Sequence, residues 1–352
     1  MTASDLQSGL AIKVDSMALR GVVCALPTQV VKNQTLAAQF GEKEVNDVIK
    51  MIGVHERRLA PPHQTAADLS QAAADRLLDE LGWARDTVDA LIFVTQTPDY
   101  TLPASACALQ ARLGLKRSCA AFDVNLGCSG YVYGLWLAGK LLDGRAIKRV
   151  LLLAGETPSK ITDPSDRSTA MLFGDGGSAS AIEFDAGAAP AHFVLGSDGA
   201  GERHLMIPSG RYKPYLGDDA RLEGRDPTCL FMDGGEIFNF TLSNIPQLVS
   251  DTLETAGKTR EQVDAFLFHQ ANTFMLKHII KKAKLAPERA PINMDRYGNT
   301  SCVSIPLLLV DKCPQVQSAP QTVAMFGFGV GYSWSGAVLD LPVLAVNRLI
   351  EV

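Results

Sequence analysis

Residues 77–93 read LLDELGWARDTVDALIF, and residues 252–268 read TLETAGKTREQVDAFLF. Each stretch carries the end of an amphipathic helix, a glycine break and a polar turn, and then Val-Asp-Ala leads into a short apolar run typical of a buried strand. In both stretches an arginine precedes the valine at the same spacing. The sequence therefore predicts one helix–turn–strand unit that occurs twice.

The similarity continues downstream of each unit. Residues 169–184, TAMLFGDGGSASAIEF, resemble residues 322–341, TVAMFGFGVGYSWSGAVLDL, and each stretch is predicted to form a strand, a glycine-rich turn and a second strand. Between these ends, each copy is predicted to hold an apolar strand, a loop and a helix, in AAFDVN-LGCSG-YVYGLWLAGKLL and in PINMD-RYGNTS-CVSIPLLLV. Strands that alternate with helices predict an α/β fold with mostly parallel sheets and helices on their faces.

Two copies of one arrangement predict two pseudo-symmetric halves. Glycine, alanine and proline interrupt the pattern near Asp185–Ala191, so we assign residues 1–187 to an N-terminal half and residues 188–352 to a C-terminal half. Ligands of open α/β sheets bind beyond the carboxyl ends of the strands. Pseudo-symmetry would bring strand ends from both halves to one cleft, and a shared site is expected there.

The composition excludes several classes of protein. The chain has 352 residues, is 47% hydrophobic and 20% charged, and carries a formal net charge of −5, so it has no basic footprint for nucleic acid. No apolar run approaches the ~20 residues that cross a bilayer, and Met1–Lys13 lacks a secretory signal pattern. Seven cysteines fit neither a disulfide framework nor CxxC zinc spacing. We expect a cytoplasmic protein without a membrane or nucleic-acid partner and without a metal.

Cys128 is the candidate nucleophile. It follows the strand-like run Ala120–Asn125 and opens a helix rich in small residues, and a helix N-terminus favours the thiolate. Gly127 and Gly130 allow backbone and substrate to approach closely. By itself, however, a lone cysteine is more often a buried structural residue.

Two further polar residues give this cysteine a chemical context. His269, in HQAN, ends the strand of the second helix–turn–strand unit, and Asn299, in YGNTS, lies in the loop that matches the Cys128 loop. A single histidine at a strand end, or an asparagine beside glycine, is usually a polar or turn residue, but these three recur at corresponding places in a repeated architecture. Cysteine, histidine and asparagine also occur in papain-like amidases, where the histidine deprotonates the thiol and the flanking motifs differ.

The order of the motifs resembles the β-ketoacyl-acyl-carrier-protein synthase III branch of the thiolase superfamily. The resemblance spans roughly residues 18–341 and rests on GCSG at Cys128, FGDG at 173–176, HQAN at 269–272, YGNTS at 297–301 and the late GFGVGYSW. It implies a five-layered αβαβα thiolase-like fold, a homodimer, no metal or redox cofactor, and thioesters of coenzyme A or acyl carrier protein as substrates. A degradative thiolase would carry a second cysteine near the final glycine-rich turn, where residues 325–335 have none.

The mechanism that the resemblance implies is a ping-pong Claisen condensation. Cys128 takes the acyl group from a thioester, and backbone N–H groups of Cys128 and of the turn at 329–331 bind the oxyanion. A malonyl thioester then loses CO₂, and His269 and Asn299 hold its enolate oxygen as hydrogen-bond donors. The resemblance also assigns residues around the substrate. The turn at the oxyanion consists of Gly329, Val330 and Gly331, and the substrate channel includes Phe173, Phe328 and Leu102. Leu102 is expected to reach across into the partner's acyl channel.

The sequence differs from housekeeping members of the family at the positions that bind the coenzyme A or carrier arm in those proteins. Asp47, Met51 and Phe274 replace aromatic or cationic groups, and Lys160 stands where an arginine would stack on the adenine. The acyl donor is therefore open, as is the choice between fatty-acid initiation and a specialised lipid or polyketide pathway. Two alternatives to condensation also stay open: acyl transfer to an oxygen or nitrogen nucleophile, and a non-catalytic subunit of a heterodimeric synthase, against which the retained polar residues argue.

Overall fold

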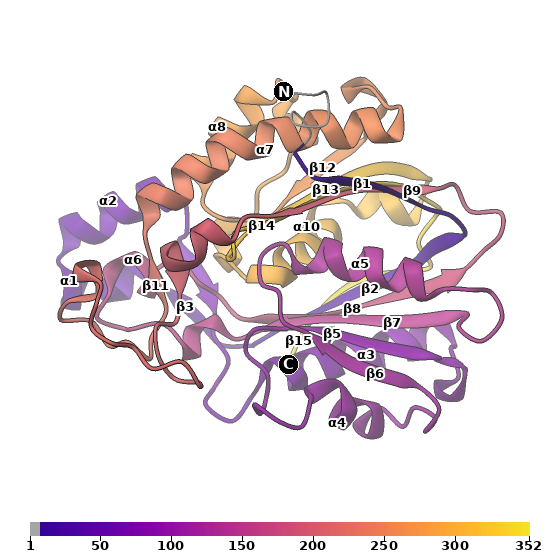
Figure 1. The fold of residues 1–352 in the computed structure, drawn as a ribbon, viewed down its shortest axis with the longest axis horizontal. Helices are drawn as coiled ribbons and strands as arrows, with labels where there is room; N and C mark the ends of the chain where they lie inside the picture. Colours follow the sequence, from indigo (N-terminus) through magenta and orange to yellow (C-terminus); the bar gives the residue numbers. More distant parts are fainter. Residues whose placement is uncertain (1–7) are drawn as a thin grey trace.

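Two mixed β-sheets lie one above the other in the computed structural model, which describes residues 8–352 (Figure 1). The first sheet has six strands in the order β15-β2-β8-β7-β5-β6, and the second has five in the order β1-β9-β14-β13-β12. The strands of the first sheet are β2 (Met17–Leu26), β5 (Ala90–Val94), β6 (Ala120–Val124), β7 (Arg149–Glu156), β8 (Gly176–Phe184) and β15 (Val346–Glu351). Those of the second are β1 (Leu10–Val14), β9 (Ala191–Ser197), β12 (Ala265–Phe268), β13 (Gln321–Gly329) and β14 (Ser333–Leu341).

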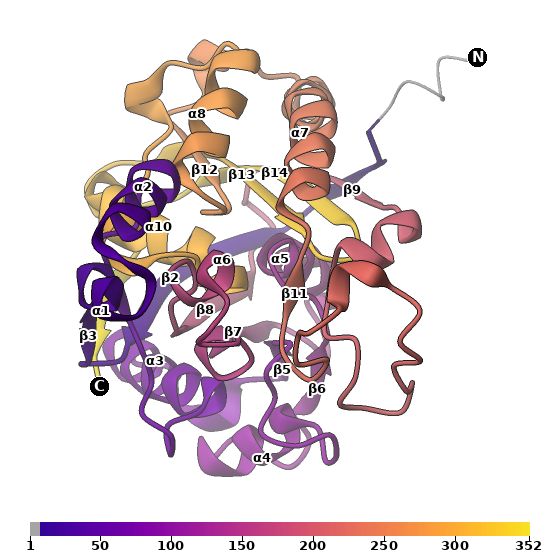
Figure 2. The same cartoon turned by 90° about the vertical axis from the view of Figure 1, so that its left-hand side faces the viewer.

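Helices complete the five layers. One outer layer consists of α3 (Ala66–Leu81) and α4 (Ser105–Arg112), which pack on the first sheet. The other consists of α7 (Gly234–Ala256) and α8 (Thr273–Lys282), with α7 packed on the second sheet and α8 packed on α7. Between the sheets lie α5 (Gly130–Leu141) and α10 (Ser304–Lys312), each in contact with both (Figure 2). The predicted αβαβα arrangement is confirmed.

The repeated helix–turn–strand unit is present in both sheets. In the first copy α3 ends at Gly82, and the 3₁₀ turn η3 (Arg85–Thr87) leads into β5. In the second, α7 ends at Gly257, and η7 (Arg260–Gln262) leads into β12. Both glycines adopt left-handed backbone angles, with φ of 65° and 62°, which a glycine C-cap adopts without strain. The pattern read from the sequence therefore corresponds to a structural repeat.

Two predicted strands are absent, and the sheets are less parallel than predicted. Residues 169–173 form the end of α6 (Arg167–Ala170) and a turn, and PINMD leads into the short helix α9 (Met294–Tyr297). Both runs are apolar because they pack beneath the site: Met171, Leu172 and Met294 are buried without belonging to a sheet. The strand that precedes β8 is instead β7, and the β7–β8 and β13–β14 pairs are antiparallel.

The two ends of the chain exchange sheets. The first strand, β1, pairs with β9 in the second sheet, and the last strand, β15, pairs with β2 in the first. The assignment of residues 1–187 and 188–352 to two halves thus describes the order of the repeats and not the strand content of each sheet. Part of the Met1–Lys13 segment, residues 1–7, lies outside the described residues.

Shorter elements connect these layers. They are β3 (Val30–Lys32), η2 (Asn33–Leu36), α1 (Ala37–Phe40), α2 (Glu42–Ile52), β4 (Glu56–Arg58), η4 (Pro158–Lys160), η5 (Gly199–His204), β10 (Leu205–Met206), η6 (Ala220–Leu222), β11 (Phe231–Met232), η8 (Pro287–Arg289), η9 (Ser301–Val303) and η10 (Pro314–Gln317). From residue 8 to residue 352, none of the helices combines the length and the apolar character that a membrane span requires.

Helix α3 lies directly on glycines of the first sheet. A Cβ added to Gly177 would lie 2.5 Å from Ser70 N and 2.6 Å from Leu69 C, both helix backbone atoms. A Cβ on Gly155, in the adjacent strand, would lie 2.7 Å from Ala66 O. Backbone atoms cannot move aside as a flexible side chain can, so the absence of side chains here sets how closely the layers pack.

We expect Gly177→Ala to destabilise the protein by about 1–3 kcal/mol, because α3 must shift away from the sheet. Thermal denaturation measures this change. The matched control is Gly199→Ala, since a Cβ there meets no atom within 4 Å. Equal melting temperatures for the two variants would show that α3 moves without cost.

Candidate active site

The Cys128 loop lies between the two sheets, after β6 and before α5. Two hydrogen bonds join it to β14: Ser129 Oγ is 2.6 Å from Ser333 Oγ, and Ser335 Oγ donates to Ser129 O at 3.0 Å. The loop also lies against glycines of β13, where a Cβ on Gly327 would be 2.8 Å from Cys128 O. Cys128, the candidate nucleophile, is thus positioned by strands β13 and β14 of the second sheet.

The end of β13 brings backbone N–H groups to the cysteine sulfur. A Cβ on Gly329 would lie 2.9 Å from Cys128 Sγ, so only glycine allows this approach. The backbone N–H groups of Cys128 and Val330 both interact with the thiol. Gly331 has a φ of 135°, an angle that favours glycine, and Ser333 Oγ donates to Val330 O at 2.8 Å. The oxyanion hole stays a prediction, and Val330 is the residue of the turn whose N–H lies at the sulfur.

The resting cysteine is a thiol. Burial raises the pKa of Cys128 to about 12, although a hydrogen bond with the Ser301 side chain and the two backbone N–H groups lower it. The sequence predicted that a helix N-terminus would favour the thiolate. The backbone N–H groups do lower the pKa of Cys128, but desolvation of the charged sulfur outweighs them and keeps the pKa above its ordinary value. The donors become most effective when the charge develops on a substrate oxygen.

His269 follows β12 and is 1% exposed. Its backbone N–H donates to Phe326 O at 2.7 Å, and its ring meets the Phe328 ring edge-on at a centroid distance of 5.5 Å. Burial lowers the pKa of His269 to about 3, while the backbone carbonyl of Ser301 raises it. The imidazole is therefore neutral at physiological pH, with one protonated nitrogen.

Ser304 governs which nitrogen of His269 carries that proton. Its hydroxyl oxygen lies 2.8 Å from His269 Nδ1 and 2.7 Å from the carbonyl oxygen of Ser301. A carbonyl only accepts, so a hydroxyl that donates to Ser301 receives the Nδ1 hydrogen and leaves Nε2 as an acceptor. In the other tautomer, which carries its hydrogen on Nε2, Nδ1 accepts a hydrogen bond from the Ser304 hydroxyl turned toward it. The sequence analysis did not anticipate this residue.

Asn299 lies in an irregular segment that crosses beside residues 172–174. Its N–H donates to Leu172 O at 2.9 Å, and its carbonyl accepts from Gly174 N at 3.0 Å. The side-chain oxygen accepts from Ser301 N at 2.9 Å, which leaves the amide N–H₂ as the group free to donate. Ser301 has a positive φ of 51°, an uncommon angle for serine, and this turn directs its side chain to Cys128.

One small cavity unites these residues. It has a volume of about 80 Å³ and includes Cys128, His269 and Asn299 among its lining residues. The remaining lining residues are Leu172, Phe173, Leu205, Met232, Gly234, Ile237, Thr241, Ala271, Asn272, Met275, Phe328 and Gly329. The predicted channel residues Phe173 and Phe328 are present, whereas Leu102 is not. Leu102 is 75% exposed, in the loop that precedes α4.

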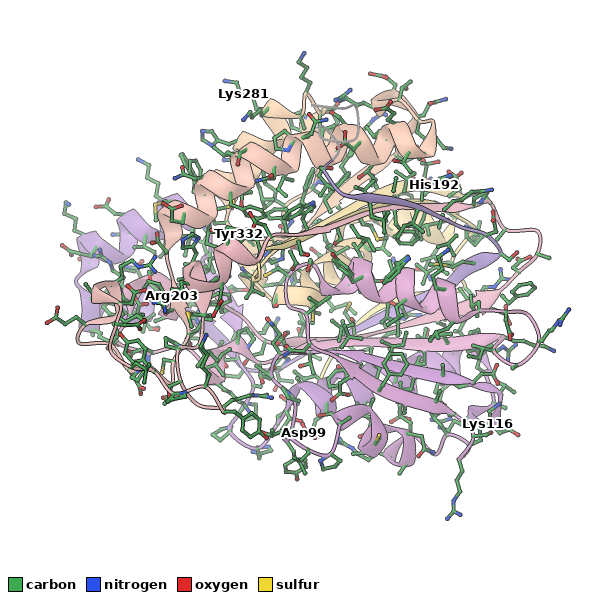
Figure 3. All side chains as sticks on the ribbon, in the orientation of Figure 1. Asp99, Lys116, His192, Arg203, Lys281 and Tyr332 are labelled. Atoms are coloured by element: carbon green, nitrogen blue, oxygen red, sulfur yellow. The ribbon has the colours of Figure 1, made fainter. Side chains whose placement is uncertain are left out.

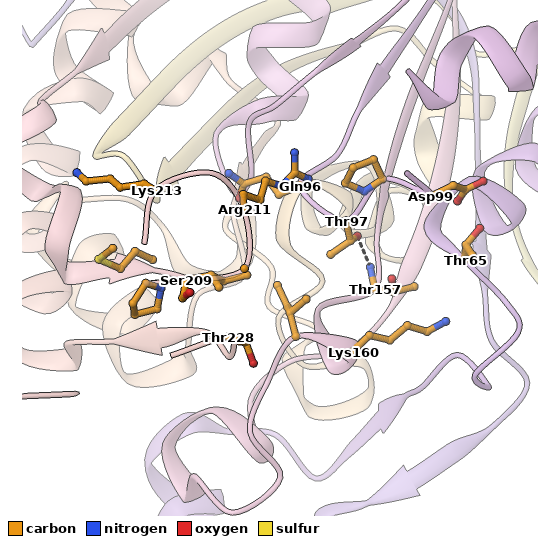
Figure 4. A pocket seen from close by; sticks show the side chains of 16 residues that line it. Thr65, Gln96, Thr97, Asp99, Thr157, Lys160, Ser209, Arg211, Lys213 and Thr228 are labelled. Carbon is orange, nitrogen blue, oxygen red and sulfur yellow. Dashed lines mark hydrogen bonds between the residues drawn. The ribbon is translucent and has the colours of Figure 1, made fainter. Parts of the chain in front are cut away.

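A larger cavity of about 610 Å³ lies next to the 96–99 and 206–213 segments, with Lys213 at one end and Asp99 and Thr65 at the other (Figure 4). Lys160 also lines it, and its ammonium donates to Pro62 O at 3.1 Å and Gln64 O at 2.5 Å. These bonds hold the Lys160 side chain against the backbone, so stacking on an adenine would require it to leave two carbonyls. In the described part of the chain, no three His, Cys, Asp or Glu residues are grouped as metal ligands.

Two buried carboxyl groups accept hydrogen bonds from the loops around the site. Asp175, of the FGDG motif, accepts hydrogen bonds from Ala60 N at 2.7 Å and from Ser159 Oγ at 2.5 Å, and so ties three loops together. Glu156, at the end of β7, accepts from Gln96 N at 2.9 Å and pairs with Thr97 Oγ1 at 2.7 Å. Burial raises the pKa of Glu156 to about 7, despite these hydrogen bonds. Sequence reasoning missed Glu156, whose only local signal is a charged residue at the end of an apolar strand.

Glu156 should make stability depend on pH. Its folded pKa of about 7 lies above the ordinary value of 4.5, so the folded state binds its proton more tightly and loses stability as pH rises from 4.5 through 7. Each unit of pKa difference corresponds to about 1.4 kcal/mol, so the loss is about 3 kcal/mol. We expect Glu156→Gln to remove this decline.

Urea denaturation at pH 5, 6, 7 and 8 measures the effect. Glu254→Gln, at an exposed position of α7, is the control and should follow the unmodified protein. A Glu156→Gln curve parallel to that of the unmodified protein would contradict the assignment.

The glycine-rich turn is also held through Tyr332, whose partners lie between residues 198 and 240. Tyr332 N donates to Asp198 O at 2.7 Å, and the Tyr332 hydroxyl pairs with His204 Nδ1 at 2.7 Å. The Tyr332 ring stacks on Phe240 of α7 with a centroid distance of 4.0 Å. Figure 3 labels Tyr332 among the side chains of the molecule. The turn that supplies the Val330 N–H therefore has partners on both of its sides.

Chemistry on a thioester requires a nucleophile that accepts the acyl group and donors that stabilise the oxyanion. Cys128 is the candidate for the first, and the N–H groups of Cys128 and Val330 are candidates for the second, in a fold with two repeated sheets around a helical layer. The fold and the site together define an acyl-transferring enzyme of the thiolase-like class.

Comparison with known proteins agrees with this class. Residues 122–199 match the model of 3-oxoacyl-[acyl-carrier-protein] synthase III, and residues 253–341 match that of its C-terminal region. A β-ketoacyl-[acyl-carrier-protein] synthase III of Chelativorans is 34% identical over 331 residues, which cover 91% of this chain and 98% of that protein.

Solved structures give the same result. The 3-oxoacyl-(acyl-carrier-protein) synthase of Burkholderia xenovorans LB400 is 51% identical with a TM-score of 0.97, and the match covers 98% of this chain and 99% of that one. The priming β-ketosynthase of the R1128 polyketide pathway is 27% identical with a TM-score of 0.81 and covers 94% and 97%. The chain belongs to the 3-oxoacyl-[acyl-carrier-protein] synthase III family and is an acyltransferase of the condensing type.

Proposed function

We propose that the protein loads an acyl group onto Cys128 and condenses it with a malonyl thioester of acyl carrier protein, releasing CO₂ and a 3-oxoacyl product. The observation that carries the proposal is the convergence of Cys128, His269 and Asn299 in one buried cavity, with the N–H groups of Cys128 and Val330 at the sulfur. Family membership supports the same chemistry.

In the first half-reaction the Cys128 sulfur attacks the thioester carbonyl. The negative charge that develops on the carbonyl oxygen is stabilised by the N–H groups of Cys128 and Val330, and the carrier thiol leaves with the proton that the cysteine loses. An oxyanion donor of this kind is typically worth about 3 kcal/mol of barrier. Desolvation of the thiol suppresses reaction with other electrophiles until a substrate fills the cavity.

In the second half-reaction the malonyl thioester loses CO₂ and leaves an enolate. Asn299 donates from its free amide N–H₂, because its oxygen is already bonded to Ser301 N. His269 donates only with a hydrogen on Nε2, a state that Ser304 supports by turning its hydroxyl toward Nδ1. The carbanion attacks the acyl-cysteine carbonyl, and the Cys128 thiolate takes up a proton as the product departs.

The roles separate by half-reaction. We expect Cys128→Ala to lose acyl loading, whereas His269→Ala and Asn299→Ala should still load Cys128 but lose condensation by at least about a hundredfold, because each removes an enolate donor. Intact-protein mass spectrometry with acyl groups on coenzyme A and on carrier protein measures loading, and CO₂ release measures condensation.

Stoichiometric acylation of Cys128→Ala would contradict the nucleophile assignment. Product formation without CO₂ release would favour the alternative of acyl transfer to an oxygen or nitrogen nucleophile. Failure of the unmodified protein to acylate with every donor would favour a non-catalytic subunit.

The preferred acyl donor is proposed to be a carrier-bound or longer acyl group and not free acetyl-coenzyme A. Asp47 pairs with Lys43 at 3.3 Å, and Met51 is 56% exposed. Phe274 stacks on Phe238 at a centroid distance of 5.7 Å. These positions offer no cation for a nucleotide phosphate. The cytoplasmic location and the absence of a cofactor stay predictions.

The edge of the first sheet supports a homodimer. Strand β6 is the last strand of that sheet, is partly exposed, and has the sequence AAFDV. An unpaired edge without lysine or proline is a template for another strand, and a second copy can pair with it about a two-fold axis. Tyr100 and Leu102, 64% and 75% exposed, follow Thr97–Asp99, which line the larger cavity.

We expect a dimer by sedimentation and a monomer for Phe122→Lys, because the lysine places a charge on the paired edge. Val343→Lys, at an exposed apolar position between β14 and β15, is the control and should stay dimeric. Leu102→Trp should shorten the acyl chain that the dimer accepts. If the unmodified protein were a monomer, the prediction that Leu102 reaches into the partner's acyl channel would be wrong.

A further inference from the structure

One hydroxyl group of helix α7 differs from the others. Ser243, Ser250, Thr252 and Thr255 each donate to the carbonyl oxygen four residues earlier, at 2.7, 3.4, 2.7 and 2.8 Å. This bond is the ordinary way in which a hydroxyl in a helix is satisfied. Thr241 makes no such bond, and its Oγ1 has no hydrogen-bond partner among the described residues although the side chain is fully buried.

Thr241 lines the active-site cavity together with Cys128 and His269. Apart from the reacting residues and Asn272, its neighbours in the lining are apolar or glycine, and none is cationic. The Asn272 side-chain oxygen is already engaged, because it accepts from Met275 N at 2.7 Å. A buried hydroxyl without a partner is unfavourable, and bound ligands commonly satisfy such groups. A lining without a cation favours a neutral polar group as that ligand over a phosphate.

We propose that Thr241 Oγ1 is a specificity subsite that forms a hydrogen bond with a neutral polar group of the bound thioester. The inference rests on the proposed function, since it takes a thioester as the occupant of the cavity. Two parts of such a substrate carry a group of this chemistry: an oxygen on the acyl chain, and the first amide of the carrier arm. A plain alkyl thioester without an arm amide would leave Thr241 unsatisfied.

The experiment compares the unmodified enzyme, Thr241→Val and Thr241→Ser. Valine keeps the shape and removes the hydroxyl, whereas serine keeps the hydroxyl. Four thioesters serve as probes: butyryl and 3-hydroxybutyryl groups, each carried on N-acetylcysteamine and on ethanethiol, which lacks the amide. Intact-protein mass spectrometry gives kcat/KM for Cys128 acylation.

We expect Thr241→Val to lose about three- to tenfold in kcat/KM with the probes that carry the bonded group and nothing with the others, and Thr241→Ser to recover the loss. If kcat/KM falls only for the two 3-hydroxybutyryl probes, the subsite binds the acyl chain. If it falls only for the two N-acetylcysteamine probes, the subsite binds the amide of the carrier arm. Equal rates for all three proteins with all four probes would overturn the proposal.

A binding measurement separates this proposal from the proposed function. Thermal shifts of Cys128→Ala and of Cys128→Ala/Thr241→Val with the same probes need no turnover. A smaller shift in the double variant, confined to the probes with the bonded group, supports the subsite even if acylation fails. Equal shifts in the two variants overturn it. The melting temperature of Thr241→Val without ligand should equal or exceed that of the unmodified protein, because the valine removes an unsatisfied hydroxyl.

Discussion

The close approach of the β13 end to the Cys128 loop is the constraint on which the site depends. Side chains at Gly327 or Gly329 would collide with the backbone or sulfur of Cys128. Contact between elements of different sheets at this distance brings the Val330 N–H to the thiol. The Ser129–Ser333 and Ser129–Ser335 bonds fix the same contact from the other side. Oxyanion stabilisation is effective when donors are held in place before the charge appears.

Burial gives the site its chemical character. The same desolvation keeps Cys128 as a thiol and His269 as a neutral imidazole, so neither residue is charged in the free enzyme. An ion pair between them would have to overcome the loss of hydration for two charges. Control of proton position therefore falls to neutral hydrogen bonds, above all that between Ser304 and His269.

The repeat explains how one chain builds such a site, and also where symmetry ends. Each copy of the helix–turn–strand unit supplies one sheet with a strand, β5 in the first sheet and β12 in the second. Cys128 lies in the segment that follows β6, and His269 lies in the segment that follows β12. The second copy, however, has no strand that corresponds to β6. In its place an irregular segment around Asn299 forms backbone hydrogen bonds with residues 172 and 174. That irregularity allows a carboxamide to reach the cavity, where a regular strand would present side chains to its two faces.

The sequence by itself determined the repeated unit and the layered α/β class, and it singled out Cys128, His269 and Asn299 of the cavity, because helix caps, strand runs and glycine-flanked motifs are local patterns. It misassigned residues 169–173 and PINMD, since an apolar run that packs beneath a cavity has the composition of a strand. Only the tertiary structure decided the exchange of β1 and β15, the burial that shifts the pKa values of Cys128 and His269, and the surroundings of Ser304, Glu156 and Thr241. Each of these depends on strand pairing, burial or hydrogen-bond partners contributed by distant parts of the chain, and such partners leave no periodic signal along it.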